Sequence, residues 1–127
     1  MKKIRWMGLL CAMALSLLLV ACGETTSKTA DLNAVMTQIE QEVSLGEMVE
    51  YSKDDLLTVF GIEAADVKQS AVKVAADGLT ATEVILIEAV DSAAADRVQD
   101  KLTAHYQAKE RENITYNPEQ YAVIEKC

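Results

Sequence analysis

The stretch VKQSAVKVAADGLTATEVILIE, residues 67–88, decides the fold of this chain. Between residues 67 and 75 the side chains alternate between two faces with the period of a β-strand. Asp77-Gly78 then indicates a tight turn. Residues 83–88 form a second strand, whose aliphatic side chains point to both faces, as is typical of a strand covered on both sides. The pattern predicts an antiparallel hairpin in which the second strand is central in the sheet.

Helices are expected before this hairpin. Asp31 is a good N-cap, and the apolar residues after it recur at helical spacing. They are Leu32, Val35, Met36, Ile39 and Val43. A shorter helix should follow the capping-box sequence at residues 52–55 and end at Gly61, a natural helix C-cap.

A long helix is expected after the hairpin. Asp91 or Ser92 would cap it, and its pattern extends to about Arg111. Its inner stripe is predicted to consist of five residues at helical spacing. They are Ala95, Val98, Leu102, Tyr106 and Lys109.

A last short helix should begin after Asn117, with Asn117 as N-cap and Pro118 as its first residue. Tyr121 and Ile124 are expected to face inward. Together these elements predict an α+β fold. A two- or three-stranded antiparallel sheet would pack against two longer helices and some short ones, in a single domain at residues 31–127.

The first 22 residues have the pattern of an export signal rather than of a folded element. Three positive charges in residues 1–5 precede an uncharged apolar run at residues 6–21, shorter than the ~20 residues that span a bilayer. The run ends in Leu19-Val20-Ala21-Cys22, a bacterial lipobox. A core helix or an uncleaved anchor explains this pattern less well. We expect residues 1–21 to be removed as a signal peptide and Cys22 to carry diacylglycerol and fatty acyl chains such as palmitate.

Residues 22–30 are small and polar and should act as a flexible tether to the membrane. The expected location is therefore the extracytoplasmic face of the cell membrane, with the domain held by its lipid anchor. Of the three cysteines, Cys11 leaves with the signal and Cys22 takes the lipid, so Cys127 is the only remaining thiol. It either pairs between molecules or indicates that the chain has been cut short.

The charge of the chain restricts its partners. It carries 12 Lys+Arg and 20 Asp+Glu, for a net charge of -8. This balance argues against nucleic acid, whose phosphates require a basic face. Removal of residues 1–21 leaves nine basic and 20 acidic residues, a charge of -11. An anionic membrane repels such a domain, so we expect it to touch lipid only through its anchor.

Several segments occur in an order that resembles a known family. They are the lipobox, residues 56–62 (LLTVFGI), residues 83–87 (EVILI) and residues 117–121 (NPEQY). The chain resembles the uncharacterised lipoproteins of Gram-positive bacteria that contain the domain of unknown function 4358, over residues 31–127. The resemblance implies a small exported α+β domain with a lipid anchor and no established activity, and it assigns no catalytic or binding residue.

One departure from that family lies at the end of the chain. In the family, the last short helix is followed by a strand with a Gly-x-Tyr-Val-like stretch, whereas this chain stops at Cys127. Either the chain is a truncated or frameshifted form, or its sheet lacks that strand. In the second case the hairpin keeps an open edge that can recruit another strand.

No catalytic pattern stands out in the sequence. His105 is the only histidine and has no evident partner, so we expect a partly exposed helix residue. The pair Asp54-Asp55 suits a helix N-terminus, and Asp77 suits a turn. The sequence contains none of the G-x-S-x-G, H-E-x-x-H or C-x-x-C motifs. We therefore expect that the protein is not an enzyme and that it has no cofactor and no metal site.

The remaining hypotheses concern binding. Tyrosines are favoured at binding surfaces, and Tyr116 and Tyr121 flank the last short helix, so they are the predicted partner face. The first hypothesis is a protein or peptide interaction module with a partner in the cell envelope. The alternative is a binder of small ligands or divalent cations, which the acidic charge could attract. A hydrolase ranks last.

Overall fold

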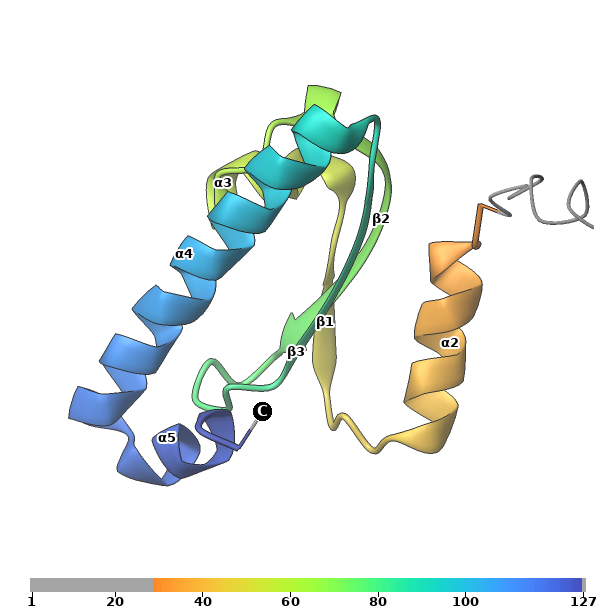
Figure 1. The fold of residues 1–127 in the computed structure, drawn as a ribbon. Helices are drawn as coiled ribbons and strands as arrows, with labels where there is room; N and C mark the ends of the chain where they lie inside the picture. The colour runs from red at the N-terminus through yellow and green to blue at the C-terminus, as the bar shows by residue number, and fades with distance from the viewer. Residues whose placement is uncertain (1–28, 127) are drawn as a thin grey trace, which may run out of the picture.

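The computed structural model describes residues 29–126, which form one sheet and its surrounding helices (Figure 1). The helices are α2 (Leu32–Glu42), α3 (Leu56–Phe60), α4 (Ser92–Tyr116) and α5 (Pro118–Ile124), with short 3-10 turns η1 (Lys53–Asp55) and η2 (Ala64–Asp66). The strands are β1 (Met48–Tyr51), β2 (Val67–Ala75) and β3 (Glu83–Ala89). The predicted α+β fold is confirmed. The predicted signal peptide, the lipidated Cys22 and most of the tether lie outside the described residues.

The three strands form an antiparallel sheet in the order β1-β2-β3. Val72 in β2 lies opposite Tyr51 on one side and Ile85 on the other. The hairpin was expected, but the prediction that its second strand is central is wrong, because β1 pairs with β2 and leaves β3 at an edge. Four residues are too few for β1 to show a clear alternation in sequence. The expectation that both faces of β3 are covered is confirmed, because α4 contacts one face and α2 the other, but coverage of its faces does not make a strand central.

The main core lies between the sheet and α4. Its buried residues come from α3, the segment after it, β2 and α4, and they are Leu56, Phe60, Ile62, Val67, Val72 and Val98. Burial of each such side chain contributes about 1.5–3 kcal/mol relative to exposure. Gly61 ends α3 with φ of 70°, in the left-handed region, as its predicted C-cap role requires. The core therefore fixes α4 across one face of the hairpin.

Helix α2 covers the opposite face of the sheet (Figure 1). The Asp31 carboxylate accepts hydrogen bonds from the backbone N–H groups of Asn33 and Ala34, as its N-cap position predicts. The backbone N–H of Leu32 donates to Oε1 of Gln69 on β2 at 3.2 Å. Glu40 forms an ion pair with Lys73 on the same strand. The sheet is thus a middle layer between two helices.

Helix α4 is longer than expected, and its inner stripe differs from the predicted one at Ala95 and Tyr106. It ends at Tyr116, five residues beyond Arg111, because no glycine or proline interrupts it before Pro118. Val98 faces the sheet as predicted, but Ala94 is buried in place of Ala95. Tyr106 is 44% exposed, and His105 takes the inward position beside it. Leu102 packs against the core and the Lys109 side chain is 20% exposed, so these two inward positions are confirmed.

Candidate functional site

The outer edge of β3 presents backbone hydrogen-bonding groups. The backbone N–H of Ala75 donates to the carbonyl of Thr82 at 3.0 Å, so these two residues form a hydrogen-bonded pair. Such pairs alternate along an antiparallel ladder, so the backbone N–H and C=O groups of Val84 and Leu86 also point toward β2. Glu83 and Ile85, like Ile87, therefore direct their backbone groups away from the sheet. Within residues 29–126, no strand pairs with this edge.

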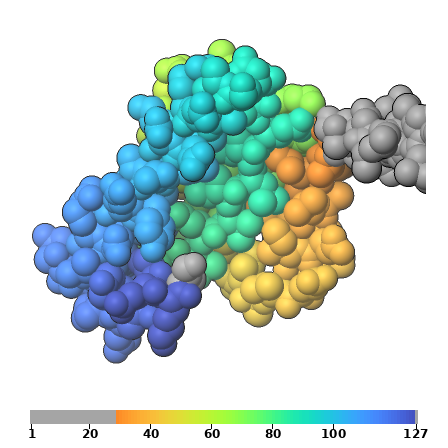
Figure 2. All heavy atoms as spheres, in the orientation of Figure 1, coloured from red at the N-terminus to blue at the C-terminus, as the bar shows by residue number. Residues whose placement is uncertain are grey.

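A groove runs between this edge and α4; we call it the β3–α4 groove. It encloses about 490 Å³ and is lined by nine residues, none of them charged: Ile85, Ile87, Ala89, Ala95, Val98, Gln99, Leu102, Thr103 and Tyr106. In the space-filling view, β3 lies exposed between α4 and α2 (Figure 2). The groove joins an apolar wall to a strand edge that is unpaired in the described part of the chain, which is an arrangement that can accept an added strand.

The opposite flank of α4 has a different character. There a hollow is lined by Gly61, Ile62, Glu63, Asp66, Arg97, Val98, Asp100, Lys101 and Ala104, five of which are charged. Arg97 donates two hydrogen bonds to the Asp66 carboxylate, and this contact lowers the pKa of Asp66 below its ordinary value. One helix thus has a charged flank toward α3 and η2 and an uncharged flank along β3.

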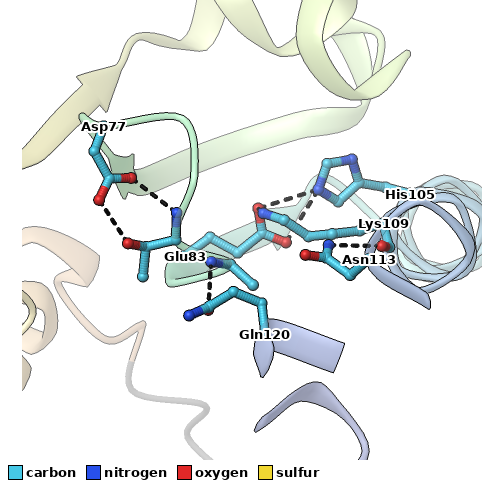
Figure 3. Close-up of polar contacts among 8 residues, drawn as sticks. Asp77, Glu83, His105, Lys109, Asn113 and Gln120 are labelled. Carbon is cyan, nitrogen blue, oxygen red and sulfur yellow. Dashed lines mark hydrogen bonds and ion pairs between the residues drawn. The ribbon is translucent and has the colours of Figure 1, made fainter. Parts of the chain in front are cut away.

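A polar cluster links the start of β3 to α4 (Figure 3). The carboxylate of Glu83 accepts a hydrogen bond from Nζ of Lys109 at 2.7 Å and lies 3.0 and 3.1 Å from Nε2 of His105. Because a carboxylate only accepts, Nε2 of His105 carries a proton in this contact. The side chains of Glu83, Lys109 and His105 are only 17, 20 and 24% exposed. The cluster ties the start of β3 to the middle of α4.

The His105 ring also packs edge-on against Phe60, with 4.8 Å between ring centroids. The expectation of a partly exposed helix residue is confirmed, but His105 has partners that we did not foresee. Glu83 is 22 residues away in sequence, so only the fold brings it near. The spacing of His105 and Lys109, four residues apart on one helix face, was a signal that could have revealed half of the cluster.

Helix α5 forms the floor of a second hollow, of about 450 Å³, which shares Ile85 and Tyr106 with the β3–α4 groove. The backbone N–H of Ala81 donates to Oε1 of Gln120 at 3.0 Å, a contact that Figure 3 includes. Nδ2 of Asn117 donates to the carbonyl of Leu79, and the Tyr106 hydroxyl donates to that of Ile124. These bonds hold the β2–β3 loop, α4 and α5 together.

The other perturbed carboxylates have structural roles. Hydrogen bonds from the hydroxyl and backbone N–H of Thr80, and then from the backbone N–H of Leu79, lower the pKa of Asp77. Figure 3 draws two of these hydrogen bonds of Asp77. Ser52 lowers the pKa of Asp55 through the predicted capping box. For Glu88, on the α2 face of the sheet, hydrogen bonds first from Gln69 and then from Lys68 lower the pKa. These acids stabilise turns, caps and strand contacts, in agreement with the turn and helix-start readings of Asp77 and Asp55.

The two predicted partner tyrosines differ in exposure. Tyr116 ends α4 and is 83% exposed, whereas Tyr121 is half-buried in α5. Ile124 faces inward as predicted and is buried. Among residues 29–126, no three His, Cys, Asp or Glu side chains are grouped as a metal site. A search of the same residues for a helix long and apolar enough to cross a membrane found none.

Comparisons with known proteins place the chain in a family. No curated protein and no solved structure matches it. One family model, described as "Domain of unknown function (DUF4358)", matches residues 41–127. The matched stretch contains the whole sheet, α4 and α5, and therefore every residue of the groove and of the polar cluster. The resemblance suggested by the sequence is confirmed: this chain belongs to the DUF4358 family.

Proposed function

We propose that this protein is a lipid-anchored interaction module on the extracytoplasmic face of the cell membrane, without enzymatic activity. The observation that carries the proposal is the uncharged β3–α4 groove beside the edge of β3, with which no strand of residues 29–126 pairs. An extended segment of a protein in the cell envelope would pair with β3, and its alternate side chains would enter the groove.

The residues of β3 support this role. A long, hydrophobic edge strand tends to pair with other chains, and proteins normally protect such edges with charge, proline or short length. β1, the other edge strand, has only four residues, and both strands carry glutamate, so length and not charge distinguishes the two edges. β3 has seven residues with four consecutive aliphatic ones, from Val84 to Ile87, and no proline. Of the two edges, β3 is the one suited to a partner.

The anchor completes the proposal. A lipobox at residues 19–22 and a polar segment after it would hold the domain close to the membrane, where its partners are envelope proteins. Cys22→Ala should therefore release the protein from the membrane fraction. If this variant stays in the membrane fraction, the anchor assignment is wrong, and the strand-pairing role stands on its own test.

Site-specific photo-cross-linking in cells tests the strand-pairing role. A photoreactive amino acid would replace Gln99 on the groove flank of α4 or, as the matched control, Ala104 on the charged flank. Both positions are exposed on the same helix. We expect the probe at Gln99 to capture a protein that the probe at Ala104 does not. Capture of the same proteins from both positions, or of none from Gln99, contradicts the proposal.

Binding of a small ligand is the second candidate function, because the second hollow, whose floor is α5, combines apolar and polar side chains as ligand sites do. Ile85 and Ile124 are apolar residues of its lining, and Gln120 and Lys109 are polar ones. A thermal-shift screen of metabolites tests this candidate. A ligand that stabilises the native protein but not a Gln120→Ala variant would support it, and a screen without any stabilising compound would count against it.

A further inference from the structure

We infer that α2 is a detachable strap between the proposed lipid anchor and the sheet, and that it opens while the sheet and α4 stay folded. This inference rests on the proposed anchor at Cys22 and adds a change in reach to it. Release of α2 and its flanking segments would free residues 29–46, which end just before β1. These residues add about 60 Å of fully extended chain between the anchor and the domain.

The first argument is the small apolar contact that holds α2. Met36 is the one buried residue of this helix, and Leu32, Val35 and Ile39 beside it are half-buried. None of the four belongs to the main core, which lies on the other face of the sheet. Elements with few buried apolar contacts open with a smaller free energy than the rest of a fold. The contact of α2 can therefore be lost while the main core stays intact.

The second argument is the length of the helix. α2 has 11 residues, and an isolated helix shorter than about 12–15 residues is marginal in water. In Figure 1 it stands alone on its side of the sheet, away from α4, and no other helix supports it. Once α2 leaves the sheet it should therefore unravel, and its residues become part of the link to the anchor.

The third argument is a hinge between α2 and β1. Ser44, Leu45 and Gly46 form no hydrogen bond with any residue of the described part of the chain. Gly46 has φ of +76°, and no atom lies within 4 Å of a Cβ added there. The carbonyl of the next residue, Glu47, accepts a hydrogen bond from the backbone N–H of Ala76 at 2.9 Å. Opening can thus stop at Glu47 and leave β1 in the sheet.

The fourth argument is a latch at the end of α2 that faces the anchor, formed by Gln69 and Glu88. Oε1 of Gln69 accepts a hydrogen bond from the backbone N–H of Leu32 at 3.2 Å, and its Nε2 donates to the carbonyl of Ala30 at 2.6 Å. The same Nε2 also donates to the carboxylate of Glu88, which orients the amide. A pull from the anchor therefore reaches Gln69 before it reaches any backbone bond of the sheet.

Thiol labelling of the full-length protein in intact cells tests the opening, in a Cys127→Ser background. Ala71 and Val72 are neighbours in β2 and both are buried, but they face opposite sides of the sheet. Ala71 lies beside Met36 under α2, whereas Val72 belongs to the main core. Ala71→Cys should react with a maleimide about ten times faster than Val72→Cys, because opening of α2 alone uncovers it.

A pair of glutamine variants tests the latch. Gln69 and Gln120 each accept a hydrogen bond from a backbone N–H, the first at the start of α2 and the second at the β2–β3 loop. Gln69→Ala should raise the labelling rate of Ala71→Cys about tenfold and leave that of Val72→Cys unchanged. Gln120→Ala, the matched control, should leave the labelling rate of Ala71→Cys unchanged.

Energy transfer in vesicles measures the reach. The purified lipidated protein would carry a donor dye at Gln107→Cys, an exposed position of α4, in the Cys127→Ser background, and the lipid headgroups would carry acceptors. Gln69→Ala should lower the transfer efficiency, because the released domain samples positions farther from the membrane. Gln120→Ala should not lower it.

The outcomes separate this inference from the proposed function. Equal labelling rates of Ala71→Cys and Val72→Cys, or an equal effect of Gln69→Ala on both, mean that α2 opens only with the whole fold, and they overturn the strap. Unchanged energy transfer in Gln69→Ala overturns the change in reach. The fractionation of Cys22→Ala and the cross-linking probes judge the anchor and the strand-pairing role separately. If Cys22→Ala stays in the membrane fraction, the change in reach fails together with the anchor.

Discussion

Replacement of Glu83 by glutamine tests the cluster that holds β3 against α4. The carboxylate of Glu83 meets both Lys109 and His105, all three at most 24% exposed. A hydrogen bond to a charged group contributes about 1.5–3 kcal/mol, and glutamine keeps one acceptor oxygen while losing the charge. We expect Glu83→Gln to lower the free energy of unfolding by about 2 kcal/mol. In a domain of this size, that corresponds to a fall of about 8–16 °C in Tm.

Urea and thermal unfolding of the purified protein measure this loss. Glu88→Gln is the matched control, because Glu88 lies on the same strand and pairs with Lys68, whose side chain is 51% exposed. We expect a smaller loss from the control, since water screens its ion pair. Lys109→Met added to Glu83→Gln should restore part of the stability, because it removes the ammonium left without its carboxylate. If Glu83→Gln costs no more than Glu88→Gln, the cluster does not stabilise the β3–α4 contact.

Three further predictions concern the fold. The pKa of Asp77 is lowered in the folded state, so its contribution to the free energy of unfolding is present above the unfolded value of 3.8 and is lost as the pH falls through the folded pKa. Asp77→Asn should therefore flatten the acid side of a plot of the urea midpoint against pH. Leu56→Ala should lower the free energy of unfolding by about 3 kcal/mol in urea titrations, since Leu56 is fully buried. Gly61→Ala should cost about 1–2 kcal/mol in the same assay, through backbone strain at φ of +70°, because only ordinary contacts with Lys101 await the added Cβ.

Much of the fold could be predicted because its signals are local. Asp31, Ser52 and Asn117 start helices through contacts within three residues, and Gly61 ends one through its own backbone angle. The β2–β3 hairpin is predicted by the alternating side chains of residues 67–75 and by the turn at Asp77-Gly78. Strand order is different, since it depends on where β1 pairs, and β1 is too short to be recognised by its pattern.

The candidate site was less predictable, because it is made by contacts between distant segments. Glu83 and His105 meet only after α4 has packed across the hairpin. The phase of α4 decides which residues line the groove, and in sequence Ala94 and Ala95 are equivalent candidates for the core. Once Ala94 is buried, Ala95 and Gln99 fall beside β3, and the uncharged flank becomes visible.

The proposed anchor and the proposed pairing support each other physically. An edge-strand contact between a small domain and an extended segment is weak in dilute solution, because association must overcome lost translational and rotational freedom. The proposed anchor would confine the domain and a membrane partner to one thin layer and raise their effective concentration without any new contact. An uncharged groove that is too weak to associate free domains can therefore be sufficient for tethered ones. For this reason the photoreactive probes at Gln99 and Ala104 must be compared in intact cells, where the proposed lipid on Cys22 would supply the confinement that the contact requires.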